Sequence, residues 1–366
     1  MKIVLIEPYF SGSHKSWATE LKFFSRHKIE IISLPGKFWK WRMRGGAITL
    51  AKEFMELNYD PDLLLATDML DLTTFLSLTR SRSSKLPVAM YFHENQLSYP
   101  LPKNSKVLQK KYERHYGFIN ISSALAADHV LFNSNYHSES FQVEGLKFLR
   151  KFPDYKEPET MDVIQKKSEV LYLGMDLSKF DKYQNIKKNN PLILWNHRWE
   201  YDKNPEPFFR NLFKLKDDGI DFKVALLGES FNSKPSIFEE AKNRLKNQIV
   251  HYGFCDEFSA YAKWVWMADI LPVTSNQDFF GGSVVESMYC DTYPLLPDRL
   301  TYPELLPNAL HAKHIYCSYD ELYNNLKKSI LNIEETRKFS QKKIFNQYNW
   351  KNIIKSYDDM FESFVS

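Results

Sequence analysis

The chain has 366 residues, 43% of them hydrophobic and 26% charged, which exceeds one ordinary α/β core and fits two domains. Its net charge of +4 permits a polyanionic partner without requiring one, and its three cysteines lack the paired spacing of a disulfide framework or a zinc site. The apolar start at residues 1–6 is too short for a signal peptide, and no stretch approaches the ~20 apolar residues that span a bilayer. We therefore expect a cytoplasmic protein without stable membrane insertion.

Short apolar runs alternate with amphipathic stretches in the first half of the chain. The apolar runs predict strands at residues 2–6, 29–34, 62–66, 87–92, 129–133 and 170–173. The amphipathic stretches predict helices at residues 15–26, 47–57, 72–79, 107–126 and 136–149. This alternation indicates a parallel sheet with helices on both faces. The charged stretch 151–167 is weakly periodic and contains proline, which is typical of a surface loop.

A second α/β series begins after a polar stretch at residues 182–190, which we interpret as a linker. Its predicted strands are residues 192–196, 223–227, 249–252, 270–274 and 293–296. Its predicted helices are residues 205–215, 236–247, 258–267 and 283–289. The sequence thus predicts two doubly wound domains, residues 1–180 and 181–347, with a cleft at the carboxyl ends of both sheets.

The segment from Asp278 to Glu286 follows a predicted strand and opens a predicted helix. Gly281 and Gly282 would let the backbone approach a ligand at the helix N-terminus, where unpaired N–H groups attract phosphate. Glu286 lies early in that helix, and its carboxylate can accept hydrogen bonds from ribose hydroxyls. A glycine-containing turn with a dipole-favoured glutamate is the structural alternative, and the spacing alone leaves both interpretations open.

Two cations follow the first predicted strand of the second domain. Arg198 can bind an anion through two parallel hydrogen bonds, and Lys203 can act as a point charge. Such groups would stabilise the negative charge that develops on a leaving diphosphate. The alternative is a pair of solvated loop cations matched with Glu200 and Asp202.

Two polar loops end strands of the first domain. His93 begins the segment His-Glu-Asn-Gln-Leu after a buried strand, where it could hydrogen-bond a sugar hydroxyl or share an acceptor proton. A structural pair of His93 with Glu94 is the alternative. Gly12 lies in the turn after the first strand, whose backbone N–H groups would face the ligand; a simple turn with Ser13 as helix N-cap is equally consistent.

Two basic segments bear on the acceptor. The first interleaves rings with cations, which suits stacking on bases and binding of phosphates: Trp39, Lys40, Trp41, Arg42 and Arg44. We interpret it as a cationic loop, although both rings could belong to the core. The second is a basic run over a predicted loop and helix, which could also be an ordinary solvated face: Lys103, Lys106, Lys110, Lys111, Arg114 and His115.

Asp60-Pro61-Asp62 has the Asp-x-Asp pattern that holds a metal in some enzymes. It precedes a buried strand, at the amino edge of the predicted sheet, and its proline fixes a turn. We interpret it as structural and predict no metal site.

Together these segments resemble glycosyltransferase family four, which has the GT-B fold of two facing Rossmann-like domains. Asp278 and Glu286 have the family spacing of two acidic residues separated by seven others, with aspartate where glutamate is usual. The resemblance implies that Glu286 binds the donor ribose, that Asp278 lies near the transferred sugar, and that Arg198 and Lys203 bind the diphosphate. It also implies that residues 348–366 form a helix that crosses back to the first domain.

A closer resemblance is to the tRNA-queuosine α-mannosyltransferase family. It rests on Ser-Gly-Ser-His-Lys at 11–15, Trp-Lys-Trp-Arg at 39–42, His-Arg-Trp-Glu at 197–200, Phe-Phe-Gly at 279–281 and, most specifically, His-Glu-Asn-Gln-Leu-Ser-Tyr-Pro at 93–100. The resemblance implies retaining transfer of mannose from GDP-mannose to queuosine in tRNA-Asp, with no metal or further cofactor.

The expected site residues fall into three groups. The residues expected to take part in catalysis are His93, Arg198, Lys203 and Asp278. Those expected to bind the donor are Gly12, Arg198, Lys203, Phe280, Gly281, Gly282, Ser283 and Glu286. Those expected to bind the tRNA acceptor are Trp39, Lys40, Trp41, Arg42, Arg44, Glu94, Asn95, Gln96, Lys110, Lys111 and Arg114.

Other functions stay open at this point. A glycosyltransferase for a lipid or cell-envelope glycan would share the fold and would favour an exposed basic amphipathic helix, for which residues 107–126 are a candidate. An inactive RNA-binding module is the alternative from a different class, and the presence of Arg198, Lys203 and Glu286 argues against it.

Overall fold

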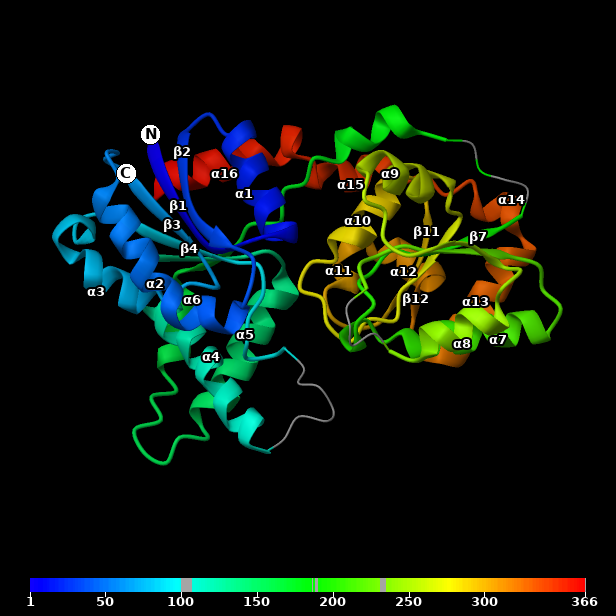
Figure 1. Ribbon diagram of the computed structural model, residues 1–366, viewed down its shortest axis with the longest axis horizontal. Coiled ribbons are helices and arrows are strands. Elements are labelled where there is room, and N and C mark those ends of the chain that lie inside the picture. Colours follow the sequence, from blue (N-terminus) through cyan, green and yellow to red (C-terminus); the bar gives the residue numbers. More distant parts are fainter. Residues whose placement is uncertain (100–106, 186, 188–189, 231–234, 366) are drawn as a thin grey trace. The chain divides into compact units, whose positions relative to one another are not determined.

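The computed structural model describes residues 1–99, 107–185, 187, 190–230 and 235–365, without the side chains of residues 107–114. Two compact units divide the chain: Met1–Asp176 together with Trp350–Ser366, and Leu177–Asn349. The boundaries expected from the sequence were residues 180 and 347. Each unit contains its own sheet and its own set of helices (Figure 1).

In the described part of the first unit, six parallel strands form a sheet in the order β2-β1-β3-β4-β5-β6. The strands are β1 (Lys2–Phe10), β2 (Lys28–Pro35), β3 (Leu63–Thr67), β4 (Val88–Phe92), β5 (His129–Phe132) and β6 (Ser168–Val170). The helices are α1 (Gly12–Phe24), α2 (Trp39–Glu56), α3 (Leu72–Ser83), α4 (Val107–Ala126), α5 (Asn135–Leu149), α6 (Thr160–Lys166) and α16 (Trp350–Ser363). The strand order reverses between β1 and β3, which is where open sheets of this kind bind ligands.

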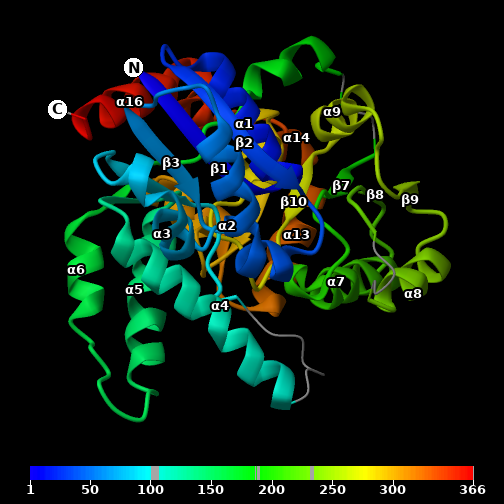
Figure 2. The same ribbon diagram turned by 60° about the vertical axis from the view of Figure 1, so that its left-hand side comes forward.

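Alternation along β1 explains the two layers of helices around this sheet. Val4 and Ile6 point to one face and join a core with α2, α3 and α5, whereas Ile3 and Leu5 point to the other and pack with α1 and α16. The terminal helix α16 lies beside α1 in both views (Figures 1 and 2). Tyr357 on α16 ties it to the sheet, because its hydroxyl donates to the Tyr172 carbonyl at 2.8 Å.

In the described part of the second unit, six parallel strands follow the order β12-β11-β10-β7-β8-β9. The strands are β7 (Leu192–Trp195), β8 (Lys223–Leu226), β9 (Ile249–Tyr252), β10 (Ile270–Pro272), β11 (Tyr293–Pro297) and β12 (Ile315–Tyr316). The helices are α7 (Pro205–Asp217), α8 (Ile237–Arg244), α9 (Phe258–Met267), α10 (Gly282–Tyr289), α11 (Tyr302–Leu305), α12 (Asn308–His314), α13 (Tyr319–Leu331), α14 (Ile333–Thr336) and α15 (Lys342–Phe345), and the 3-10 turns are η1 (Leu177–Tyr183), η2 (Tyr201–Lys203) and η3 (Asn346–Tyr348). This is the strand order of a dinucleotide-binding Rossmann domain, and it reverses between β7 and β10.

Three local predictions were wrong. The stretch 151–167, expected to be a loop, contains α6, whose Met161 and Ile164 are buried in the core of the first unit. The expected cationic loop at residues 39–44 is the first part of α2. The expected N-cap at Ser13 is also incorrect, because α1 begins at Gly12 with Ser11 as its N-cap. In the first two cases burial of apolar side chains stabilises a helix that the local charge pattern concealed.

None of the described helices combines the length and the hydropathy that crossing a membrane requires.

Candidate active site

In the second unit, the loops after β7 and β10 contain the cations and carboxylates singled out from the sequence. Both loops are held by the protein itself. The Trp195 indole donates to the His197 carbonyl at 2.9 Å, and the Asn276 amide donates to the Asp202 carbonyl at 2.7 Å. Because β7 and β10 are hydrogen-bonded neighbours, the two loops leave the sheet side by side at its switch point.

Lys203 is buried and joins these two loops. Its Nζ donates to the Gln277 carbonyl at 2.7 Å and to Asp278 Oδ2 at 3.3 Å, and it lies 3.5 Å from Asp202 Oδ2. Burial of a cation is costly unless it is paired, and here two carboxylates and a carbonyl compensate it. The alternative of a solvated loop cation is therefore wrong for Lys203.

Arg198 has a different environment. Its side chain is exposed and lies 3.0 Å from Glu200 and 3.8 Å from Asp202. An exposed guanidinium beside two carboxylates is oriented by them and remains able to bind an anion through its fork of N–H donors.

Asp278 is held by two donors from different segments. Besides Lys203, the Tyr302 hydroxyl on α11 donates to Asp278 Oδ2 at 2.8 Å. Burial alone would raise the pKa of Asp278, but the positive charge of Lys203, together with His197 and the Tyr302 hydrogen bond, holds it below its ordinary value. Asp278 is thus a carboxylate at neutral pH. The tyrosine was missed in the sequence, where nothing separates it from a core residue.

The glycine turn before α10 has the conformation that the sequence required. Gly281 is the N-cap with φ of +83°, a left-handed conformation that glycine adopts without strain, and Gly282 is the first helical residue. Ser283 Oγ lies 3.1 Å from His197 Nδ1, so the turn contacts the loop after β7. Burial, with Lys203 nearby, lowers the pKa of His197 to about 4, which makes this imidazole neutral. Phe280 is buried and packs edge-on against Tyr348 at 5.2 Å, behind the turn.

Glu286 is half-buried one turn into α10. The Tyr261 hydroxyl, from α9, donates to Glu286 Oε2 at 2.6 Å, and Asn196 Nδ2 lies 3.4 Å from the same hydroxyl. Tyr261 therefore fixes the orientation of the carboxylate that is expected to meet a ribose. Neither Tyr261 nor Asn196 was predicted, because only the packing of α9 against α10 brings them to Glu286.

In the first unit, His93 belongs to a buried polar cluster at the carboxyl ends of three strands. The cluster includes Glu7 in β1, His14 in α1 and Asp68 directly after β3. Glu7 Oε2 lies 3.0 Å from His14 Nδ1, and the His93 amide donates to Asp68 Oδ1 at 2.8 Å. Ligand atoms of Glu7, His14 and His93 lie within 4.8 Å of one another. The expected pair of His93 with Glu94 is replaced by this set.

Charge is distributed unevenly over this cluster. Burial alone would lower the pKa of His14, but Glu7, helped by Asp68 and Glu94, raises it to about 9. Burial and the neighbouring His14 lower the pKa of His93 well below its ordinary value. At neutral pH, His14 is therefore an imidazolium paired with Glu7, and His93 is a neutral imidazole.

The residues after His93 have structural and exposed parts. Asn95 is fully buried, and its Oδ1 accepts hydrogen bonds from the Leu97 and Ser98 amides, both at 3.0 Å. It shapes the loop and is not itself positioned to meet a large acceptor, contrary to the sequence-based expectation. Gln96 Nε2 donates to Glu94 Oε1 at 2.9 Å, and both side chains are partly exposed.

The aromatic and cationic residues at the start of α2 form a mixed surface. Trp39 is half-buried against Tyr116, with ring centroids 5.2 Å apart, so this ring is partly core. Trp41 is 63% exposed. Arg44 lies over the Tyr116 ring at 5.0 Å, and Lys40 over Trp39 at 5.4 Å.

The remaining expected residues are placed as follows. Arg42 Nε donates to the Pro35 carbonyl at 3.1 Å. Gly12 is the first residue of α1, with φ of +51°. The helix predicted at residues 107–126 coincides with α4, but the side chains of Lys110, Lys111 and Arg114 lie outside the described residues, as do residues 103 and 106 altogether.

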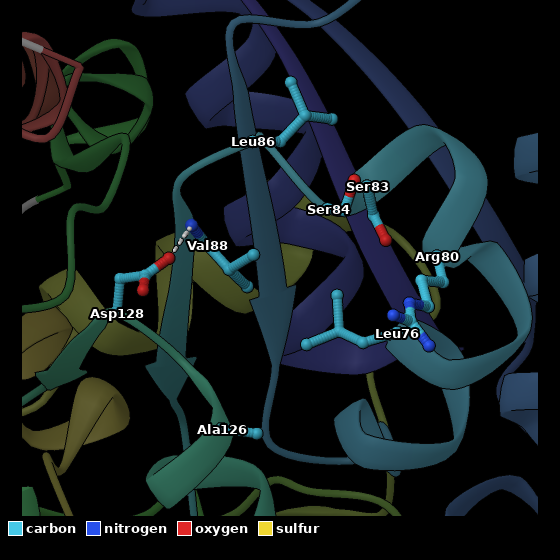
Figure 3. Close-up of a pocket in the computed structure, with 8 residues that line it drawn as sticks. All are labelled: Leu76, Arg80, Ser83, Ser84, Leu86, Val88, Ala126 and Asp128. Atoms are coloured by element: carbon cyan, nitrogen blue, oxygen red, sulfur yellow. Dashed lines mark hydrogen bonds between the residues drawn. The ribbon is translucent and has the colours of Figure 1, made fainter.

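Asp62, from the Asp-Pro-Asp segment, accepts a hydrogen bond from the Lys2 amide at 2.7 Å, at the start of the sheet. The structural interpretation of this segment agrees with that contact. A cavity of about 250 Å³ also lies at this amino end of the strands, where Asp128 accepts from the Val88 amide at 2.9 Å (Figure 3). Its lining includes Arg80 but no residue of either candidate site.

A stability prediction follows from the loop after β8. Gly228 has φ of +107°, and a Cβ there would lie 2.1 Å from the His197 carbonyl oxygen. We expect Gly228→Ala to lower the free energy of unfolding by about 3 kcal/mol or more, because a backbone carbonyl must move. Gly219→Ala is the matched control: it has φ of +73° and open space, so only about 1–2 kcal/mol of backbone strain applies. Urea unfolding of both variants measures the difference, and equal losses would contradict the role of the His197 contact.

Comparison with known proteins places the chain. Residues 2–175 match the family described as tRNA-queuosine alpha-mannosyltransferase N-terminal, and residues 178–347 match glycosyl transferases group 1. A tRNA-queuosine alpha-mannosyltransferase of Drosophila melanogaster is 31% identical over 374 residues, covering 100% of this chain and 97% of that protein. A probable sucrose-phosphate synthase of Thermosipho melanesiensis is 24% identical over 221 residues, 58% of this chain and 52% of that protein.

Solved structures agree on the fold. HepE of Anabaena, in complex with UDP and glucose, has a TM-score of 0.68 at 14% identity, covering 99% of this chain and 100% of that chain. A glycosyltransferase of Rickettsia africae has a TM-score of 0.69 at 15% identity, covering 100% and 98%. The two six-stranded parallel sheets and these likenesses confirm the GT-B fold. The family resemblance drawn from the sequence is likewise confirmed: the chain belongs to the tRNA-queuosine alpha-mannosyltransferase family, and it is a glycosyltransferase.

Proposed function

We propose that this enzyme transfers mannose from GDP-mannose to queuosine in tRNA-Asp, with retention of anomeric configuration, in the cytoplasm. The observation that carries the proposal is the full-length similarity to the Drosophila melanogaster enzyme, whose name specifies both mannosyl transfer and queuosine tRNA. The polar loops of the second unit support it, because they combine cations, a glycine turn and a ribose-type carboxylate at one switch point.

In this proposal the second unit binds the donor. Its diphosphate contacts Arg198, Lys203 and the turn at residues 281–283, where the first N–H groups of α10 have no partner within the helix. Glu286, oriented by Tyr261, accepts hydrogen bonds from the ribose hydroxyls. Asp278 lies near the transferred sugar, and as an ionised acceptor held by Lys203 it suits sugar hydroxyl donors.

Transfer proceeds by front-face displacement. The bond between the anomeric carbon and the diphosphate oxygen breaks while an acceptor hydroxyl oxygen bonds to the same face of that carbon. The hydroxyl proton passes to the departing diphosphate, so atoms and charge balance without a protein nucleophile. Arg198 and Lys203 stabilise the charge that develops on the leaving group, and no metal ion is required for this role.

The first unit binds the acceptor. His93 meets the reacting hydroxyl, and Glu94 and Gln96 contribute polar groups beside it. Trp41 and the cations of α2 contact the tRNA, since exposed rings and guanidinium groups suit unstacked bases and phosphates. Lys110, Lys111 and Arg114 on α4 are proposed to add phosphate contacts.

Two measurements test this function. We expect GDP to raise the melting temperature of the protein, and UDP and ADP to have little effect, because a ligand that binds only the folded state stabilises it. Stabilisation by UDP alone would contradict the proposed donor.

Mass spectrometry of queuosine-containing tRNA after incubation with GDP-mannose tests the acceptor. The expected product is one added hexose on queuosine, absent with tRNA that lacks queuosine. Hexose transfer to a lipid or glycan instead would replace the acceptor, and tRNA binding without any transfer would favour an inactive RNA-binding module.

A further inference from the structure

Three residues from separate elements meet in the buried polar cluster of the first unit: Glu7 in β1, His14 in α1 and His93 after β4. We propose that Glu7 and His14 act as a positioning pair that keeps His93 a neutral imidazole, with its Nε2 atom directed to the reacting acceptor hydroxyl. This inference rests on the proposed function for the hydroxyl, whereas the state of His93 can be tested without any substrate.

The geometry shows why the pair acts on His93 and not only on the fold. The rings of His14 and His93 are 4.3 Å apart between centroids and tilted by 42°, so the two imidazoles are in contact. His14 cannot turn away, because its Nδ1 lies 3.0 Å from Glu7 Oε2, and Glu7 Oε1 accepts the Tyr9 amide at 2.8 Å. Trp17 meets His93 edge-on at 4.7 Å and closes its other side.

His93 itself has one unmatched atom. Its backbone amide donates to Asp68, but its Nε2 is buried and has no hydrogen-bond partner among the described residues. A buried polar atom without a partner is costly, and in native structures such atoms commonly belong to sites that a ligand completes. A hydroxyl group of the acceptor would supply the missing partner.

The charges around His93 explain its protonation. His14 is an imidazolium because Glu7, with Asp68 and Glu94, raises its pKa to about 9 against the effect of burial. A second proton on His93 would then place two cations in contact, which burial makes more costly. His137 on α5, also facing this ring, adds no charge, because burial lowers its pKa well below the ordinary value. Asp68 is the opposing group, and burial raises its pKa to about 8, which weakens its pull on a proton.

A metal ion is the competing occupant, because the same three residues have the ligand types of a two-histidine, one-carboxylate site. A metal would have to displace the contact between His14 and Glu7 and the proton that His14 holds so strongly. The ion pair is therefore the occupant that the described contacts favour.

His14→Gln is the sharpest test, since glutamine keeps an N–H donor for Glu7 but removes the positive charge beside His93. Histidine labelled with ¹³C at the ring allows the His93 signal to be followed by NMR in the free protein, with assignment by its loss in His93→Asn. In the parent protein we expect no titration of this signal between pH 5.5 and about 8. In His14→Gln the pKa of His93 rises, and its titration enters that range.

Activity provides the second readout. A neutral His93 is lost as pH falls through its pKa, so we expect kcat/KM of His14→Gln to fall about 10-fold more than that of the parent between pH 7.5 and 5.5. Glu7→Gln should shift both readouts in the same direction but less, because His14 then holds its proton less strongly.

His27→Gln is the matched control. His27 is also buried in the first unit, where its Nε2 contacts the Asp358 carbonyl at 3.2 Å, so its loss affects packing of α16 without removing a charge beside His93. Stability should fall in this variant, while the His93 signal and the pH profile stay unchanged. An unshifted His93 signal in His14→Gln would overturn the inference even if transfer activity is found, and a shifted signal without any transfer activity would reject only the proposed function. Stoichiometric metal in the purified protein, lost in His93→Asn, would also overturn it.

Discussion

Replacing Arg198 by alanine is expected to lower kcat by about 100- to 1000-fold, equivalent to about 2.7–4 kcal/mol, with a much smaller change in KM for the donor. Arg198 is exposed and lies 3.0 Å from Glu200 and 3.8 Å from Asp202, so its guanidinium is held by carboxylates at the switch point of the second sheet. Charge on the leaving diphosphate grows as the glycosidic bond breaks. The guanidinium therefore stabilises the transition state more than the bound donor.

Single-turnover and steady-state rates of hexose transfer measure this effect. Arg210→Ala is the matched control: Arg210 is also an exposed arginine of the second unit, paired with Glu206 and Glu240 on its own and a neighbouring helix. Its activity should remain within about 2-fold of the parent, because exposed ion pairs contribute little. Arg198→Lys should recover part of the rate, since it restores the charge without the two-pronged geometry. A parent-like kcat in Arg198→Ala would remove this residue from catalysis.

Replacing Glu286 by alanine is expected to weaken GDP binding by about 30- to 150-fold, because hydrogen bonds to a charged group contribute about 2–3 kcal/mol. The carboxylate is half-buried at one turn into α10, and the Tyr261 hydroxyl already holds Oε2 at 2.6 Å. An acceptor fixed in this way loses little conformational entropy when a ribose arrives. Calorimetric titration with GDP measures the dissociation constant directly, without an acceptor.

Two variants separate this role from general effects on the second unit. Tyr261→Phe keeps the carboxylate but removes its orienting hydrogen bond, so we expect a loss of only a few-fold. Glu240→Ala removes a carboxylate on α8 that pairs with Arg210, and it should leave the dissociation constant unchanged. Unchanged GDP binding in Glu286→Ala would contradict the ribose contact, and an equal loss in Glu240→Ala would indicate a change in folding.

Before any comparison with known proteins, the sequence determined the two parallel sheets. Runs of four to nine apolar residues, such as those of β1 and β7, can be buried on both faces only in a sheet covered by helices on each side. Because ligands bind at the carboxyl ends of such strands, the same pattern located the polar segments at Arg198, Lys203 and Glu286. These inferences depend on neighbours in the sequence, and the structure places the strands within a few residues of the predicted limits.

Only the tertiary structure decided which side chains complete each site. Tyr302 meets Asp278 from 24 residues away, Tyr261 meets Glu286 from 25 residues away, and His14 meets Glu7 across the turn that joins β1 to α1. A lone tyrosine has the same local signal in a core as beside a carboxylate, and Glu7 differs from its neighbours in β1 only as a charge in an apolar strand. The helix at residues 39–44 was hidden for the same reason, because Trp39 packs on Tyr116, a contact that periodicity cannot report. Local pattern fixes which element forms, whereas hydrogen bonds and packing between distant elements fix what each side chain can do.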